Sequence, residues 1–260
     1  MIFRMELNNY IKGTIIAAIV LGFFLIMVIS MYPMMQDQMA GMMRMIENLG
    51  MFKQALKIDG LIISELLGFY GMEMENMLGV GGAFFAGYLG IKLIAKEESY
   101  HTAEFMLSHP MSRVNFYLQK SLAAMILILL FNGISAMIAY LGILFSNQNI
   151  VMSDFIQLHY ANFLVHLFIL WFCLGISAFM RQDMVGLGLG YVFILYVLNI
   201  FTNLFNELEY LKWITPFQFA YTADILGPGL NYQLVMTTGT LAIVVWLLGA
   251  IYYNQKDIYG

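Results

Sequence analysis

Two histidines, His159 and His166, stand seven residues apart in an apolar stretch, and Asp154 precedes them. Seven residues make two helical turns, so both imidazoles would lie on one face of a helix. A histidine beside a carboxylate is a candidate general base, and imidazole also binds zinc. However, the sequence has no H-E-x-x-H or G-x-S-x-G motif and no third ligand at helical spacing. The pattern therefore favours structural roles, with His159 at the edge of the apolar stretch and His166 hydrogen-bonded between helices.

A second group of polar residues occupies the 24-residue stretch EESYHTAEFMLSHPMSRVNFYLQK, Glu97 to Lys120, which holds five formally charged side chains. The whole chain is otherwise apolar: 61% of its residues are hydrophobic and 11% are charged, with a mean hydropathy of +0.78. Soluble domains are roughly 45 to 50% apolar and about 25% charged. The composition thus predicts an integral membrane protein.

The same totals exclude several functions. A net charge of -4 without a basic run argues against DNA or RNA as a partner. The single cysteine, Cys173, allows no intramolecular disulfide and no multi-cysteine metal site. We therefore expect no metal and no cofactor in this chain.

The spacing of charged residues predicts six transmembrane helices, because a spanning helix needs about 20 mostly apolar residues. The first apolar run is long for a signal peptide and lacks a following A-x-A site, so we expect an uncleaved span. We expect an all-α, single permease domain over residues 1–260, with an interfacial helix at 1–12 and spans at about 13–35, 76–95, 119–145, 159–180, 184–205 and 232–254.

Basic residues predict the orientation, because lysine and arginine are retained on the cytoplasmic side. With both termini inside, eight basic residues fall inside and four outside. The stretch from Glu97 to Lys120 then becomes the cytoplasmic connection between the second and third spans. Each charge costs about 2.5 to 3.5 kcal/mol at the bilayer centre, so this stretch is not expected in lipid.

Local order is expected within this connection. Ser99 or Thr102 can cap a short helix that carries Phe105, and Pro110 ends it. Ser112 can cap the helix that follows. A short helix with an apolar side, held between two spans, suits docking to a partner. On charge and period alone, a solvated amphipathic linker is the favoured interpretation over a docking helix.

This connection resembles a motif of the type-2 ABC transporter (ABC-2) permeases, of the form E-E-x-x-G-T-x-E-x-L-L-x-x-P-x-S-R. His101 replaces the usual glycine, and Met106 fills one leucine position. Weaker similarities occur at Tyr32-Pro33, at Thr215 to Phe217 and at the ending Tyr253 to Ile258. The matching residues are Glu97, Glu98, Thr102, Glu104, Leu107, Pro110, Ser112 and Arg113.

The resemblance implies that this segment is a coupling helix that docks on a separate ABC ATPase. It implies two permease copies, as a homodimer or heterodimer, with two ATPase subunits in a bacterial plasma membrane, both termini being cytoplasmic. The chain has no G-x-x-x-x-G-K-[ST] motif, so ATP and Mg²⁺ are expected only in the partner ATPase. The residues implied in coupling are Glu97, Glu98, Thr102, Glu104, Phe105, Leu107, Pro110, Ser112 and Arg113.

The family includes exporters, and nearly uncharged spans suit an amphipathic or lipophilic substrate such as a peptide or drug. The resemblance therefore implies a permease subunit for efflux, itself not an enzyme. Three alternatives stay open: a lipid or glycolipid flippase subunit, a membrane-embedded hydrolase using the two histidines, and a passive sensor or immunity protein.

Methionines gather between the first two spans, where 11 of the 22 lie between Met31 and Met77. Residues 34–75 carry too many charges for a span, and their apolar residues fall at helical spacing. We expect an amphipathic, methionine-rich extracellular segment, with adaptable apolar surface favoured over Cu(I) binding. The residues expected at a possible substrate exit are Met35, Met39, Met42 and Met43.

The second span contains small residues four apart, which let helices approach closely. We expect packing contacts here, within the subunit or across a dimer. These residues are Gly82, Ala83, Ala86, Gly87 and Gly90.

Overall fold

The computed structural model describes residues 2–36, 38, 50, 65–100 and 112–256. Within these ranges the chain is helical and contains no strand. Six helices are long and apolar enough to cross a membrane. The prediction of an all-helical protein with six spans is therefore confirmed.

The first three spans are longer than a bilayer requires. The interfacial helix and first span expected separately form one helix, α1 (Ile2–Gln36). The second span is built from α5 (Leu66–Met74), η1 (Glu75–Gly79) and α6 (Val80–Ser99). The third span is α8 (Arg113–Phe145). At 1.5 Å per residue, helices of 33 to 35 residues exceed the hydrocarbon core of about 30 Å.

The remaining spans are α9 (Met152–Ser177), α10 (Val185–Leu204) and α12 (Tyr232–Gln255). Side-chain caps fix two helix starts. Ser112 Oγ accepts a hydrogen bond from the Asn115 N–H at the start of α8, as expected from the sequence. Asn231 Oδ1 accepts from the Gln233 and Leu234 N–H groups at the start of α12.

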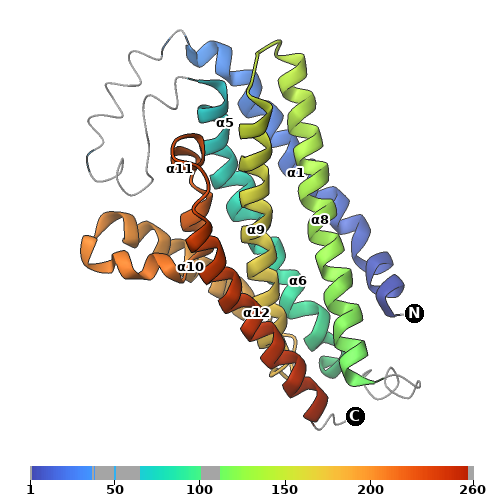
Figure 1. Cartoon of the computed structure of the whole chain (residues 1–260). Coiled ribbons are helices and arrows are strands. Elements are labelled where there is room, and N and C mark those ends of the chain that lie inside the picture. Colours follow the sequence, from blue (N-terminus) through green and yellow to red (C-terminus); the bar gives the residue numbers. More distant parts are fainter. Residues whose placement is uncertain (1, 37, 39–49, 51–64, 101–111, 257–260) are drawn as a thin grey trace.

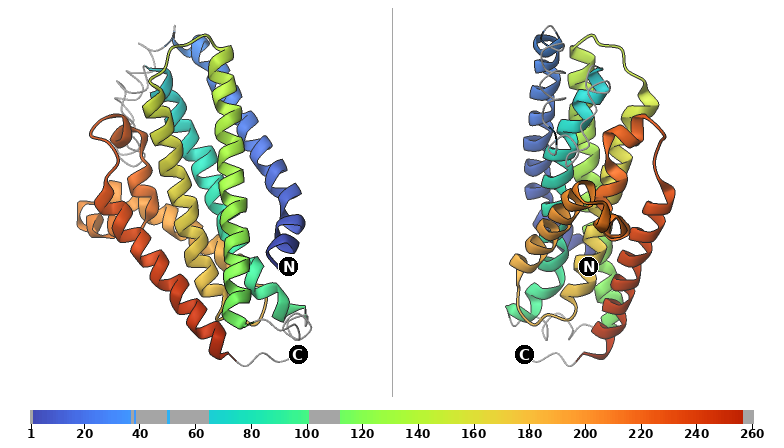
Figure 2. Two further views of the ribbon diagram at one scale, coloured as in Figure 1. Left: turned by 45° about the vertical axis from the view of Figure 1, so that its right-hand side comes forward. Right: turned by 90° about the vertical axis from the view of Figure 1, so that its left-hand side faces the viewer.

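The bundle is organised around α9 (Figure 1). In its most apolar stretch 67% of the residues are buried, compared with 28% in α10 and in α12. Helix α6 packs along α9 and α10, α12 packs along α9, and α1 packs along α8. Figure 2 shows α1 and α12 on opposite sides of the bundle. Their outer faces carry exposed apolar side chains, as lipid-facing helices do.

Between α10 and α12 the chain forms η2 (Asn206–Trp213), η3 (Pro216–Ala220) and α11 (Thr222–Leu226). In Figure 1 the η2–η3 part lies beside the middle of the bundle, below α11. Exposed Glu209 and partly exposed Lys212 form an ion pair of 2.5 Å on η2, which lowers the pKa of Glu209.

Candidate coupling site

Four charged side chains form a buried cluster where α1, α6 and α8 meet, at the end of the bundle near both termini (Figure 1). Lys120 Nζ lies 2.8 Å from Glu6 Oε1 and 2.7 Å from Glu97 Oε1. Lys96 Nζ lies 2.5 Å from Glu6 Oε2. The side chains of Glu6 and Lys120 are 0% exposed. Two carboxylates and two ammonium groups give the cluster no formal net charge, which is how charges are tolerated away from water.

Three helix ends position this cluster. Glu6 is in the second turn of α1, Lys96 and Glu97 are in the last turn of α6, and Lys120 is two turns into α8. Lys120 Nζ also donates a hydrogen bond of 2.6 Å to the carbonyl of Leu93. The ammonium group is therefore held by two carboxylates and a backbone oxygen, so it retains hydrogen-bond partners in place of water.

A third buried lysine, Lys256, joins the end of α12 to the same region. Lys256 Nζ lies 2.7 Å from Glu98 Oε1, and its side chain is 2% exposed. It also donates hydrogen bonds to the carbonyls of Ala178, at 3.1 Å, and Met180. Arg113 Nη1 donates to the Lys256 carbonyl. Glu98 and Arg113 flank residues 101–111, so both flanks contact Lys256, the residue that follows α12.

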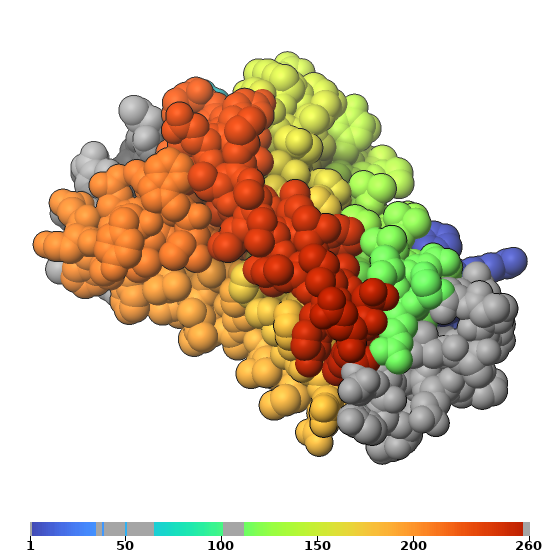
Figure 3. All heavy atoms as spheres, turned by 60° about the horizontal axis from the view of Figure 1, so that its bottom comes forward, coloured from blue at the N-terminus to red at the C-terminus, as the bar shows by residue number. Residues whose placement is uncertain are grey.

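These contacts bring distant parts of the chain to one surface. Figure 3 looks onto that end and shows the last residues of α12 beside the first residues of α8. Lys92 of α6 adds an ion pair with Asp183, which precedes α10. Ion pairs and hydrogen bonds thus join α1, α6, α8 and the end of α12 around the two flanks of residues 101–111.

A comparison with models of protein families matches residues 1–258 to the model described as ABC-2 family transporter protein. The match takes in nearly all of the 260 residues. The chain belongs to the ABC-2 transporter family. A search of curated proteins gave no match. Membrane components of the ABC-2 family normally work with an ABC ATPase.

The sequence motif of the ABC-2 permeases is only partly visible in the structure. Glu97 and Glu98 lie in the last turn of α6, Ser112 caps α8, and Arg113 is its first residue. The other residues that the resemblance implied in coupling lie outside the described residues: Thr102, Glu104, Phe105, Leu107 and Pro110. The same holds for three of the methionines predicted at the substrate exit, Met39, Met42 and Met43, and for the side chain of Met35.

The small residues of the second ABC-2 span lie in contacts within the subunit. A Cβ atom at Gly90 would lie 2.5 Å from Cys173 Cβ, and one at Gly87 would lie 3.1 Å from the Gly188 carbonyl oxygen. Helix α6 therefore approaches α9 and α10 more closely than larger side chains would permit. Gly82 lies against His166, and Ala83 and Ala86 are fully buried.

Both histidines lie on α9 in buried hydrogen bonds. His166 Nδ1 lies 3.0 Å from Asn132 Oδ1, and His166 Nε2 lies 3.0 Å from the Gly79 carbonyl oxygen. Since both ring nitrogens are engaged, His166 joins α8, α9 and the second span. His159 Nε2 lies 2.7 Å from the Tyr70 hydroxyl. These contacts fit structural histidines in an ABC-2 permease.

Glu6 was missed by the sequence-based prediction of the site. It is one acidic residue near the start of an apolar helix, and its spacing gives no sign of its partners. A signal for Lys256 existed, because it belongs to the terminal sequence that resembles the ABC-2 family. Its pairing with Glu98 nevertheless required the fold, since 158 residues separate the two positions.

Proposed function

We propose that this ABC-2 membrane component is the permease subunit of an ATP-driven exporter. Two permease copies and two ATPase subunits assemble in a bacterial plasma membrane, with both permease termini in the cytoplasm. The transporter moves an amphipathic or lipophilic substrate, such as a peptide or drug, out of the cell. ATP and Mg²⁺ bind to the ATPase, and the permease itself performs no catalysis.

The family match across residues 1–258 carries the proposal, and the ion pairs at the flanks of residues 101–111 support it. In the proposal, residues 101–111 include the helix that docks on the ATPase. Glu97 contacts Lys120 and Glu98 contacts Lys256, so a displacement of the docking segment would be passed to α6, α8 and α12 together. Coupling requires such stiffness, because a loosely held segment would move without moving the spans.

The role of each ion-paired residue follows from its position. Glu97 and Lys120 are buried, whereas Arg113 is half-buried and donates a hydrogen bond to the Lys256 carbonyl. We assign Glu97 and Lys120 to the transmission of motion. Glu104 and Arg113 belong to the docking contact itself in this proposal.

Co-purification tests the proposal directly. The permease carries an affinity tag and is expressed with its ABC ATPase, and the double variant Glu104→Lys, Arg113→Glu is compared with the unchanged chain. We expect at least tenfold less ATPase to be retained. The matched control is Glu209→Lys, Lys212→Glu, which reverses an ion pair on η2 away from this end. Equal ATPase retention by all three proteins, each eluting as a folded species, would refute the docking role.

Two other functions remain as candidates, each with a distinguishing measurement. For a lipid or glycolipid flippase, lipid alone would stimulate ATP hydrolysis by the partner ATPase. A fluorescent-lipid translocation assay would detect the flipping activity. A hydrolase would lose all activity when His159 or His166 is replaced. The hydrogen bonds of His166 to Asn132 and Gly79 favour the structural role, because they occupy both ring nitrogens.

A further inference from the structure

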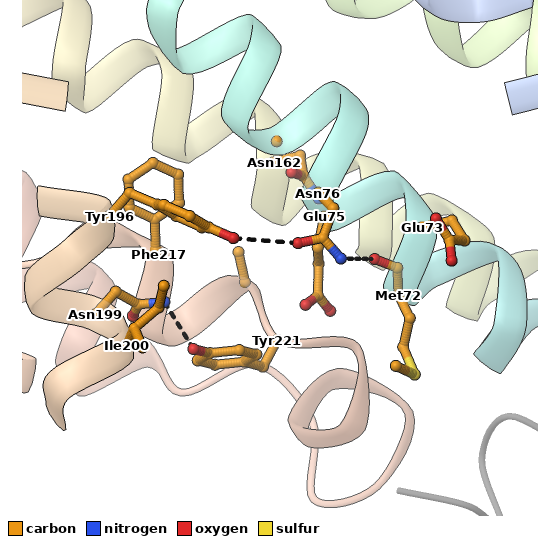
Figure 4. A pocket seen from close by; sticks show the side chains of 12 residues that line it. Met72, Glu73, Glu75, Asn76, Asn162, Tyr196, Asn199, Ile200, Phe217 and Tyr221 are labelled. Carbon is orange, nitrogen blue, oxygen red and sulfur yellow. Dashed lines mark hydrogen bonds between the residues drawn. The ribbon is translucent and has the colours of Figure 1, made fainter. Parts of the chain in front are cut away.

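A pocket of about 190 Å³ lies between the second span and α10 (Figure 4). Glu75 and Asn76 project from η1 toward Tyr196 of α10 and toward Tyr221 on the opposite wall. Drug-sized ligands occupy pockets of roughly 300 to 1,000 Å³. This pocket therefore has room for the head of a larger molecule and not for the whole of it.

The charge of the wall is negative. Glu73 and Glu75 contribute carboxylates, and no lysine, arginine or histidine is among the described residues that line the pocket. Glu75 accepts a hydrogen bond from the Thr222 backbone N–H, which fixes the position of its carboxylate. Ionisable groups within membrane spans are rare, and by default they indicate functional sites. A positively charged group is the complementary ligand.

Aromatic rings form the second part of the wall. Tyr196 and Phe217 pack edge to face with their ring centroids 5.6 Å apart, and Tyr221 lies across the pocket from them. The faces of aromatic rings attract cations, most strongly where water is displaced. Burial raises the pKa of the Tyr221 phenol, so Tyr221 contributes a neutral ring to the wall.

Amide oxygens supply further acceptors. Asn199 lines the pocket and is 3% exposed, and its Oδ1 atom is buried without a hydrogen-bond partner among the described residues. Its Nδ2 group donates to the Tyr221 hydroxyl at 2.7 Å. A buried acceptor without a partner carries an energetic cost of about 1 to 3 kcal/mol, which a ligand N–H group would remove.

The backbone at the pocket is irregular in a way that is frequent at functional sites. Residues Glu75–Gly79 form a π-helical turn inside an otherwise α-helical span. A Cβ atom at Gly79 would lie 2.7 Å from Asn162 Oδ1. Glycine at this position therefore leaves the Asn162 amide oxygen at the pocket wall instead of covering it.

We propose that this pocket binds the ammonium head of a cationic amphiphile, with Glu75 as the counter-ion and Tyr196, Phe217 and Tyr221 as the aromatic wall. This inference rests on the proposed export function and names its substrate class. Phe193 stands three residues before Tyr196, on the same face of α10, and is 59% exposed. The tail of the amphiphile would lie along this apolar face while its head enters the pocket.

Equilibrium binding to the permease alone tests the proposal. The full chain is placed in nanodiscs of zwitterionic lipid, without ATPase, and is titrated with radiolabelled decylammonium, whose head carries N–H donors. Decyl sulfate and the uncharged decyl methyl sulfoxide serve as comparison probes. We expect the ammonium probe to bind at least tenfold more tightly than either comparison probe. Equal binding of all three probes would overturn the proposal.

Variants then locate the site. Glu75→Gln retains an oxygen for the Thr222 N–H but removes the charge, and we expect it to weaken ammonium binding at least tenfold. Glu209→Gln makes the same charge change outside the pocket and should bind as the unchanged chain does. Tyr196→Leu should weaken binding three- to tenfold, whereas Tyr196→Phe, which keeps the ring face, should not.

Unchanged binding in Glu75→Gln and in Tyr196→Leu would overturn the assignment. If Glu75→Gln fails to fold, the comparison of Tyr196→Leu with Tyr196→Phe decides alone. Because no ATPase is present, a failure of coupling leaves these results unchanged. The export proposal and the ligand proposal are therefore contradicted by different experiments.

Discussion

Glu97 and Lys120 lie 23 residues apart in the sequence, and their charged groups meet at 2.7 Å in a buried position. Residues 101–111 lie between them in the chain. The ion pair thus holds the end of α6 and the start of α8, the two helices that flank that segment, together. Glu6, from the start of α1, completes the closure by binding the same ammonium group at 2.8 Å.

Replacement of Lys120 by methionine should destabilise the protein strongly. The side chain is 0% exposed, and its loss leaves Glu6 and Glu97 with one ammonium group instead of two. Breaking a buried ion pair on one side costs about 3 to 5 kcal/mol. Thermal unfolding of the purified protein in nanodiscs measures the change. Lys12→Met removes an exposed lysine of the same helix bundle, and its unfolding free energy should stay within about 0.5 kcal/mol of that of the unchanged chain. Equal melting temperatures for both variants would contradict the prediction.

A double-mutant cycle should show that Glu6 and Lys120 act together. Glu6→Gln and Lys120→Met each leave an unbalanced charge, whereas the double variant removes one charge of each sign. We therefore expect the double variant to be less destabilised than the sum of the single variants, by about 0.5 to 3 kcal/mol. Unfolding free energies that simply add would mean that the two side chains do not interact in the membrane-embedded protein.

Alanine at Gly90 and at Gly190 should have opposite effects on stability. A Cβ atom at Gly90 would lie 2.5 Å from Cys173 Cβ and 3.0 Å from the Leu170 carbonyl oxygen, so α6 and α9 would have to separate. Overpacking of this kind costs about 1 to 3 kcal/mol. No atom lies within 4 Å of the Cβ position at Gly190, where alanine should stabilise the helix by roughly 0.5 to 1 kcal/mol. Melting temperatures that change in the same direction would disagree with the α6–α9 contact.

His166→Ala should reduce stability without a specific loss of function. The substitution removes the ring that contacts Asn132 Oδ1 and the Gly79 carbonyl oxygen in a buried place. A neutral imidazole has one N–H group, so one of these acceptors loses its donor, at a cost of about 1 to 3 kcal/mol. Transport per folded molecule, measured with reconstituted permease and ATPase, should stay near that of the unchanged chain. Complete loss of transport in a variant that remains folded would instead assign His166 to the substrate pathway or to chemistry.

The helices were predictable because the membrane imposes a length on apolar segments. The apolar stretches that follow Lys120 and that lie between Asp154 and Arg181 form most of α8 and α9. Ser112 was predictable as a cap, since serine before a helical run can satisfy a free N–H group. Local rules of this kind need no knowledge of the neighbouring helices.

The partners of Glu6, Lys256 and Glu75 were not predictable from local patterns. Glu75 was expected in an external segment, yet it lies in η1 and binds the Thr222 N–H, 147 residues later. Its pocket also needs Tyr196 and Phe217, and aromatic residues in apolar spans normally indicate packing. Only the three-dimensional arrangement distinguishes an aromatic wall around a carboxylate from ordinary core.

The balance of charge in the cluster of Glu6, Lys96, Glu97 and Lys120 affects how the protein responds to voltage. An electric field across the membrane acts on each elementary charge, with about 2.3 kcal/mol per 100 mV for a full crossing. Forces on the two carboxylates and the two ammonium groups oppose each other and sum to zero when the cluster moves as a unit. Changes in the membrane potential therefore exert no net force on this cluster, although it holds four charges.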